Sequence, residues 1–145
     1  MNSMRLMILG MLVMTTMACT MRLNFVPSVP PGTGAVANVG HVNAAQRAAV
    51  VGTWREYWQD REGCHDVMQI DIVGRQLALS GADCNTGEAY MISQAGYDGE
   101  ALVFTLTTPS TGFSHQYTLN PRPDGSLQGD AVGQGKLNPI SWQRL

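Results

Sequence analysis

The amino-acid sequence predicts an all-β protein whose single domain is an eight-stranded antiparallel up-and-down barrel, preceded by a signal peptide and a disordered linker. Residues that favour strands recur in short groups separated by turn residues, and the chain contains 16 glycines, a composition typical of a fold with many reversals. No segment after the leader has the periodicity of a crossover helix, so consecutive strands are expected to pair as a meander. Pairing of the last strand with the first would close the sheet and remove its exposed edges.

Residues 1–18 are predicted to be a signal peptide. One positive charge, Arg5, precedes an apolar run over residues 6–14, which is the arrangement of a secretory leader. The run is shorter than the stretch of about 20 apolar residues that a lasting transmembrane helix needs. The sequence therefore predicts export of the mature protein.

The leader ends at Ala18-Cys19, which resembles the cleavage site of bacterial lipoproteins. In that family the cysteine is lipidated and becomes the new N-terminus, so the resemblance implies a lipid anchor on Cys19. It also implies a protein of the bacterial cell envelope that is anchored to a membrane, at the outer membrane or the periplasmic face. This chain has Thr16 where the family prefers Leu, and cleavage after Ala18 by the ordinary signal peptidase is the alternative.

Residues 19–45 are predicted to be the lipidated N-terminus and a linker rich in proline and glycine. The first part of the linker should favour extended polyproline and the second part flexible coil. It is expected to be either a spacer between membrane and domain or a remnant with no task of its own. Residues 44–49 are expected to form one helical turn, and the barrel domain is placed at residues 46–145.

The cysteine count predicts one disulfide. The chain has three cysteines, and assigning Cys19 to the lipid leaves Cys64 and Cys84 as a pair in an exported domain. Closing a loop of this size stabilises a small domain by about 3 kcal/mol. The alternative is a metal site that adds His65 and Asp66 to the two cysteines. Neighbouring side chains on a strand point to opposite faces, so no metal site and no cofactor are predicted.

Alternation of apolar and polar residues places the first four strands. The first strand covers residues 50–58, and the second follows with apolar side chains at 68, 70 and 72. A turn at Gly74 leads to the third strand, which carries leucines at 77 and 79. The fourth strand, residues 89–94, leaves its phase open, because either its even-numbered or its odd-numbered side chains could face inward.

The last four strands are separated by turns rich in glycine, aspartate and proline. Asp98-Gly99 is a strong hairpin signal, and it precedes a strand with inward side chains at 102, 104 and 106. Residues 113–119, 127–131 and 140–144 alternate in the same way. The sequence thus predicts a barrel in which the eighth strand meets the first.

The predicted interior is crowded with large side chains. An eight-stranded barrel either fills its interior or holds one small ligand, and this number of bulky residues predicts a mostly filled core. The inward candidates are Trp54, Trp58, Met68, Ile70, Ile72, Leu77, Leu79, Leu102, Phe104, Leu106, Phe113, Tyr117, Leu119, Ile140 and Trp142.

Gly52-Thr53-Trp54 on the first strand, with Arg144 on the last, resembles the lipocalin and avidin barrels of the calycin type. In those barrels a Gly-x-Trp start and a late basic residue pack across the closed end. The resemblance implies that Trp54 and Arg144 close this barrel, with the guanidinium stacked on the indole. The chain is shorter than a lipocalin and lacks its flanking helix.

A Gly-x-Trp start followed by two cysteines about twenty residues apart is similar to the bacterial metalloprotease-inhibitor barrels. In that family the segment before the barrel enters the protease cleft, which implies an exposed and extended arm at residues 44–50 here. The similarity ends after Cys84, where the loops and the C-terminal strand depart from the family's pattern.

The candidate ligand-binding residues are aromatic or polar side chains expected to point inward. His115 lies between Phe113 and Tyr117 on one face of its strand, while Glu56 is in phase with Trp58. A carboxylate opposite His115 would form a polar site, and a histidine satisfied inside the barrel is the alternative.

Catalysis is not expected. Ser114 points away from the face of His115, so the pair does not suit a nucleophile and its base. His65, Asp66 and Asp83 read as loop residues beside the disulfide and not as an acid-base pair. The sequence shows no phosphate-binding loop, zinc motif or catalytic triad, which predicts a protein that is not an enzyme.

The charge and composition of the chain limit the kinds of partner it is expected to bind. Charged residues make up 14% of the chain, the net charge is -2, and all acidic residues lie at or after Glu56, which argues against nucleic acid. We therefore expect a small apolar ligand or an envelope protein as the partner. An outer patch of Val51, Tyr57, Val103 and Pro139 is the expected surface for a protein partner.

Overall fold

The computed structural model describes residues 35–59 and 61–145, and the predicted signal peptide and Cys19 lie outside these ranges. The described chain forms one nine-stranded sheet and one short helix. The elements are β1 (Ala35–Asn38), α1 (Ala44–Val50), β2 (Gly52–Trp58), β3 (Val67–Val73), β4 (Gln76–Ala82), β5 (Met91–Tyr97), β6 (Leu102–Thr108), β7 (Phe113–Pro121), β8 (Leu127–Gly133) and β9 (Lys136–Arg144).

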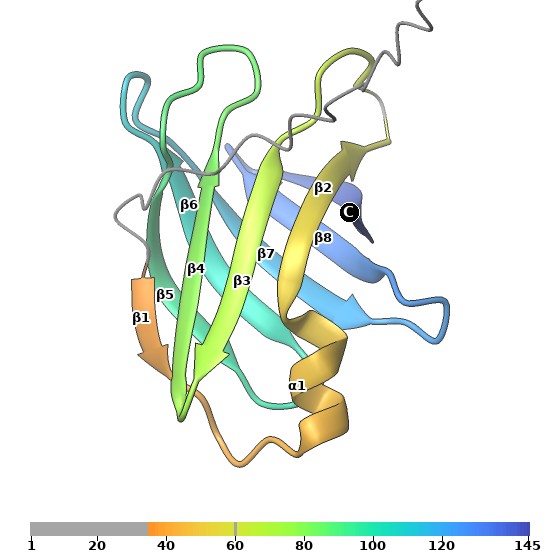
Figure 1. Cartoon of the computed structure of the whole chain (residues 1–145). Helices are drawn as coiled ribbons and strands as arrows, with labels where there is room; N and C mark the ends of the chain where they lie inside the picture. The colour runs from red at the N-terminus through yellow and green to blue at the C-terminus, as the bar shows by residue number, and fades with distance from the viewer. Residues whose placement is uncertain (1–34, 60) are drawn as a thin grey trace, which may run out of the picture.

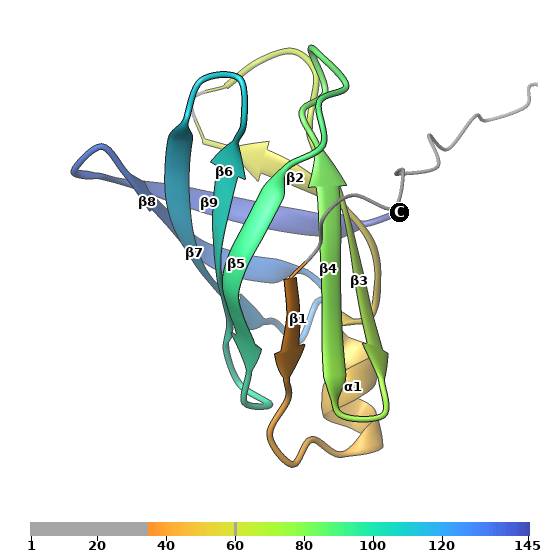
Figure 2. The ribbon, with the colours of Figure 1, turned by 90° about the vertical axis from the view of Figure 1, so that its left-hand side faces the viewer.

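Strands β2 to β9 form the predicted eight-stranded antiparallel barrel. The sheet order is β1-β4-β3-β2-β9-β8-β7-β6-β5, so β9 pairs with β2 and joins the two ends of the meander. The barrel is nearly closed, because β4 and β5 form no ladder with each other. The segments at the end of β4 and just before β5 are joined by the bridge between Ala82 and Ala89 and by hydrogen bonds from the Tyr90 N–H to the Gly81 carbonyl and from the Asp83 N–H to the Glu88 carbonyl. Figures 1 and 2 show this arrangement from two directions.

Strand β1 fills the lower part of the gap between β4 and β5 (Figure 2). It pairs antiparallel with β4, from Ala35 opposite Leu79 to Asn38 opposite Gln76. The sequence prediction assigned these residues to flexible linker, and the structure differs for a backbone reason. The outer edge of β4 carries N–H and C=O groups that need partners, and a four-residue segment without proline or glycine supplies them.

The end of the barrel with α1 is called the floor, and the end with the turns after β2, β4, β6 and β8 is called the mouth. Figure 1 shows α1 beneath the barrel, opposite the loops that follow β2 and β4. The helix begins with a capping box, in which Asn43 and Gln46 exchange hydrogen bonds of 2.9 Å. The predicted helical turn before the first strand is therefore confirmed. None of the helices in the described ranges is long and apolar enough to cross a membrane.

The hairpin between β5 and β6 turns where its sequence predicts. The Asp98 carboxylate accepts hydrogen bonds of 2.8 Å from the backbone N–H groups of Glu100 and Ala101. Gly99 adopts a φ of 100°, a conformation that L side chains rarely take. The preceding strand uses its even-numbered phase at the start, because Tyr90 and Ile92 are buried.

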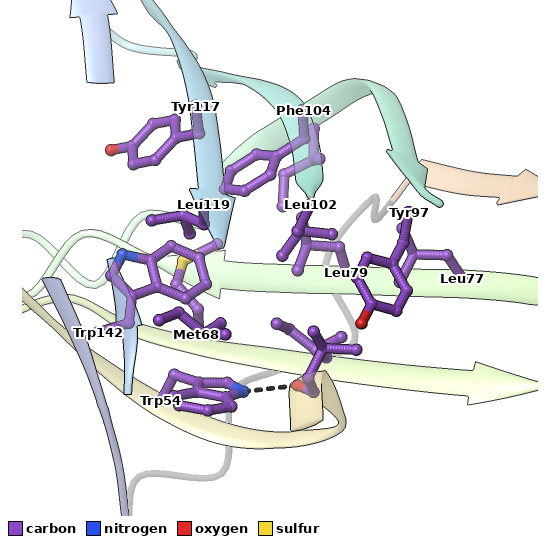
Figure 3. Close-up of a cluster of buried hydrophobic side chains, with 14 of the residues drawn as sticks. Trp54, Met68, Leu77, Leu79, Tyr97, Leu102, Phe104, Tyr117, Leu119 and Trp142 are labelled. Carbon is purple, nitrogen blue, oxygen red and sulfur yellow. Dashed lines mark hydrogen bonds between the residues drawn. The ribbon is translucent and has the colours of Figure 1, made fainter. Parts of the chain in front are cut away.

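The barrel interior is filled by its own side chains, as predicted (Figure 3). Phe104 and Tyr117 stack with ring centroids 4.7 Å apart, and Trp142 lies 5.7 Å from Phe104. The largest fully buried side chains are Trp54, Trp142, Tyr117, Phe104, Met68, Ile70, Leu77, Leu79, Leu102, Leu119, Leu127 and Glu56.

Two of the predicted inward residues are not part of the sealed core. Phe113 is 52% exposed, because it is the first residue of β7 and stands beside the β6–β7 turn at the mouth. Trp58, the last residue of β2, is half-buried and packs against the core from above. Alternation fixes the face of a strand, but it does not fix where the strand leaves the barrel.

Candidate functional site

The disulfide predicted from the cysteine count is confirmed. Cys64 and Cys84 are bonded, with their Cα atoms 5.8 Å apart, and they join the β2–β3 loop to the β4–β5 loop at the mouth. Asp66 strengthens this junction, since its Oδ1 accepts a 2.9 Å hydrogen bond from the Cys84 N–H. The disulfide therefore holds the part of the mouth where the barrel wall is least continuous.

The alternative metal site at this position does not assemble. Both cysteine sulfurs are used in the disulfide, and the His65 ring packs on Tyr57 with ring centroids 4.3 Å apart. Within residues 35–59 and 61–145, no group of three or more histidine, cysteine, aspartate or glutamate side chains is placed to hold a metal ion.

The floor is built around Trp54 and Arg144. The Arg144 guanidinium carbon lies 4.4 Å from the centroid of the Trp54 ring, and Nη2 donates to the carbonyls of Ala48 and Ala49 at 2.9 and 3.2 Å. The Trp54 Nε1–H donates to the Val50 carbonyl at 2.8 Å, the dashed line in Figure 3. These contacts tie the helix to the first and last strands of the barrel.

Gly52 explains the glycine of the Gly-x-Trp pattern. Its φ is 145°, and a Cβ at this position would lie 2.7 Å from the Arg144 Nη1 atom. A side chain here would therefore push the guanidinium away from its position over Trp54. Gly52 and Arg144 therefore act together, and their role is to stabilise the fold.

The segment that would be an inhibitory arm is not extended. Residues Ala44–Val50 form α1, Val50 is fully buried, and the Tyr97 hydroxyl donates to the Gln46 carbonyl at 3.0 Å. The arm implied by the similarity to metalloprotease-inhibitor barrels is therefore wrong for this chain. Because the helix carbonyls are held by Arg144, the segment is part of the floor.

A polar network lies inside the upper half of the barrel. Glu56 is fully buried, and its Oε1 accepts a 3.0 Å hydrogen bond from the Tyr117 hydroxyl. Its second oxygen, Oε2, has no hydrogen-bond partner among the described residues. Asp66, which is 5% exposed, accepts from the Tyr90 hydroxyl at 2.8 Å and lies 3.8 Å from Arg61 Nη1. Two buried acids thus share one nearby cation.

The environment of Glu56 favours its neutral form. Burial raises its pKa from the ordinary 4.5 to about 8, the negative charge of Asp66 adds to the rise, and the Tyr117 hydrogen bond and Arg61 oppose it. The neighbouring Trp58 indole lowers the pKa of Glu56 slightly. Its buried Nε1–H has no hydrogen-bond partner among the described residues. At neutral pH the carboxyl is therefore largely protonated.

A pocket opens at the mouth, above this network. It has a volume of about 330 Å³ and lies between the end of β2 and the β8–β9 hairpin. Trp58 and His115 meet in it edge to face, with ring centroids 5.6 Å apart and planes at 75°. The lining residues are Trp58, Gln59, Arg61, His115, Leu137, Asn138 and Pro139.

The structure divides the four predicted ligand-binding residues into two pairs. Trp58 and His115 line the mouth pocket, whereas Tyr117 and Glu56 hydrogen-bond to each other in the sealed core beneath it. Tyr117 is the connection between the pairs, since its ring centroid lies 6.5 Å from that of Trp58. Burial also lowers the pKa of His115, so its imidazole is neutral at pH 7.

Sequence reasoning missed the other polar groups of the pocket. Arg61 belongs to the β2–β3 loop, and Asn138 stands on β9 near the β8–β9 turn. The position of a loop side chain depends on the path of the backbone, and alternation carries no signal for it. The turn at Gln134-Gly135, where both residues have positive φ, is the local feature that folds β9 back beside β8.

The predicted outer patch is not one surface. Val103 lies on β6, which β7 and β8 separate from β9, and Val51 packs against the core. Tyr57 and Pro139 do lie together, and they line a shallow pocket of about 360 Å³ beside the end of β2.

The nearly closed barrel of eight antiparallel strands is consistent with a calycin-like fold. No protein-family model, curated protein or solved structure matches this chain.

Proposed function

We propose that this protein is a bacterial envelope lipoprotein whose barrel acts by binding a small molecule at its mouth, without catalysis. The observation that carries this proposal is the pocket formed by Trp58, His115 and their neighbours above a filled interior. Ligand sites in β-barrels form in the mouth or the interior. Because large side chains occupy this interior, the mouth is the part left to receive a ligand.

The membrane anchor rests on the sequence and on the disulfide. Cys64 and Cys84 are bonded to each other, so the remaining cysteine, Cys19, is the odd thiol of an exported chain. Lipidation removes that thiol and agrees with the position of Cys19 directly after an apolar leader. Mass spectrometry of the mature protein tests this part. A Cys19→Ala precursor that is still cleaved and anchored would exclude lipidation.

The binding role is supported by the chemistry of the pocket. The carboxyl of Glu56 has the raised pKa that a general acid needs. It is fully buried beneath Trp58 and hydrogen-bonded to Tyr117, so a ligand in the pocket does not reach it. The described residues that line the pocket supply an indole, an imidazole, amides, a guanidinium and two apolar side chains, and none of these residues carries a carboxylate or a hydroxyl. These groups suit recognition of a ligand and not proton transfer between paired catalytic groups.

The test is a screen of small fragments against the full chain, with binding detected from the signals of the fragments by NMR. Fragments that bind the wild type should lose binding to Trp58→Ala. The matched control is Phe113→Ala, because Phe113 is an aromatic residue at the mouth that does not line the pocket. If no fragment distinguishes the wild type from Trp58→Ala, the pocket is not a binding site.

A further inference from the structure

We propose that the mouth pocket recognises a small planar ring that carries a carboxylate, with the ring against Trp58 and the carboxylate on the Arg61 guanidinium. This inference rests on the proposed binding function and names its ligand class. It depends on three features of the pocket: a fixed aromatic wall, a guanidinium with free donors, and a volume suited to one or two rings.

The aromatic wall is held in place before any ligand arrives. Trp58 is braced edge to face by His115, at 75°, and by Tyr117, at 85°. Leu137 and Pro139 supply apolar surface on the opposite strand. A planar ring gains most from such a wall, because aromatic contact adds to the burial of apolar area, and a wall that is already ordered loses little entropy on binding.

The Arg61 guanidinium forms no side-chain hydrogen bond with another residue in the described part of the chain. It lies within salt-bridge distance of Asp66, but the 3.8 Å between Arg61 Nη1 and Asp66 Oδ2 is too long for a hydrogen bond. Asp66 is otherwise engaged, because its two oxygens accept from the Cys84 N–H and the Tyr90 hydroxyl. The guanidinium side chain is 37% exposed and lines the pocket, and its planar fork matches a carboxylate in two parallel hydrogen bonds.

The charges around the pocket favour an anion over a cation. Arg61 lines the pocket, while the Asp66 side chain is only 6% exposed and stands behind it. Glu56 lies below Trp58 and is largely protonated at neutral pH, and His115 is neutral there. Among the residues that the structure describes, the one charged side chain lining the pocket is thus a cation.

Neutral polar groups complete the site. The side chains of Gln59 and His115 form no hydrogen bond with another residue that the structure describes, and Asn138 uses only its Nδ2 group, which donates to the Ala131 carbonyl at 3.3 Å. These groups can orient a carboxylate or a ring substituent. A volume of about 330 Å³ lies at the lower end of the range for ligand pockets, about 300–1,000 Å³, which favours a molecule of one or two rings.

The experiment compares three probes with the full chain at neutral pH: benzoate, benzyl alcohol and acetate. Benzoate should bind saturably, with a Kd on the order of 1 mM, and the two probes that lack either the charge or the ring should bind about tenfold more weakly or worse. Arg61→Gln should abolish the preference for benzoate over benzyl alcohol. Arg61→Lys should restore only part of it, because an ammonium lacks the planar fork.

Arg75→Gln is the matched control, because Arg75 is exposed on the β3–β4 turn at the other end of the barrel. It should leave all three affinities unchanged. Equal binding of benzoate and benzyl alcohol to the wild type, or a benzoate preference that survives Arg61→Gln, would overturn the inference. If benzoate does not bind while other fragments bind in a manner that depends on Trp58, this inference fails and the binding function stands. If no fragment depends on Trp58, both fail.

Discussion

The buried carboxyl of Glu56 makes the stability of the barrel depend on pH, and Glu56→Gln should remove that dependence. Glutamine has nearly the same shape and keeps an oxygen that can accept the 3.0 Å hydrogen bond from the Tyr117 hydroxyl. It cannot ionise. The change therefore isolates the proton of one side chain in a core that is otherwise unaltered.

The magnitude follows from the pKa of Glu56, which burial raises from 4.5 to about 8. At 1.36 kcal/mol per pH unit this rise corresponds to about 5 kcal/mol. Below pH 4.5 the carboxyl is protonated in both the folded and the unfolded chain. Between pH 4.5 and 8 only the folded chain holds the proton, so the free energy of unfolding of the wild type falls as the pH rises, and the loss is complete above pH 8.

Glu56→Gln should therefore be more stable than the wild type at pH 9. The gain is smaller than 5 kcal/mol, because the new amide N–H group occupies the position of Oε2, which has no partner among the described residues, and an unpaired buried donor costs about 1–3 kcal/mol. A net gain of about 2–4 kcal/mol at pH 9, and a loss of up to about 2 kcal/mol at pH 5, is the expected pattern. The stability curves of the two proteins should cross between these pH values.

The assay is urea unfolding from pH 5 to pH 9 with the disulfide intact. This window avoids most of the contribution of Asp83, Asp98 and Asp124, whose pKa values are lowered and whose effects appear under more acidic conditions. Glu62→Gln, an exposed change in the β2–β3 loop, is the control and should keep the slope of the wild type. If Glu56→Gln keeps that slope as well, the reasoning about the buried carboxyl is refuted.

Three further predictions concern the disulfide and the floor. Replacing Cys64 and Cys84 together by serine should lower the free energy of unfolding by about 3 kcal/mol, measured by urea unfolding; a loss below 1 kcal/mol would mean that the loops are held by other contacts. Arg144→Ala should cost about 2–4 kcal/mol through the lost contact with Trp54 and the carbonyls of α1, and Arg144→Lys should recover less than half of the shift in thermal midpoint. Gly52→Ala should destabilise by at least about 1 kcal/mol because its Cβ meets Arg144, whereas Gly40→Ala, with open space around it, should melt like the wild type.

Much of the fold follows from alternation along the chain. In β3 every second side chain is buried, namely Met68, Ile70 and Ile72, as the alternation of apolar and polar residues predicts. The same alternation correctly identifies the inward residues of β4 and β6. The phase of the fourth predicted strand stayed open for a physical reason. Its register with β6 shifts between Ser93 and Gly96, and Gln94 has a positive φ, so no single alternation describes the whole segment.

The contacts of the candidate site were less predictable. The phase of β2 places Glu56 inward, but its partner is Tyr117 and not His115, because the stagger between β2 and β7 is set by the strands that separate them in the sheet. Arg61 reaches the pocket from a loop. Strand β1 was missed because it is held by pairing with the backbone of β4. Backbone pairing of this kind produces no alternation of apolar and polar residues in the sequence of β1.

The pairing of β2 with β9 also sets the order in which the barrel can form. The chain emerges from its N-terminus during synthesis and during the proposed export, and β2 then exposes one edge until its partner appears, since Trp54 pairs with Arg144 and Trp58 with Ile140. In the folded sheet β3 covers the other edge of β2. The last nine-residue strand of the protein therefore decides when the wall becomes continuous. Until that strand arrives, the nascent domain carries a free sheet edge of the kind that recruits other chains, and a stalled or truncated product would keep it permanently.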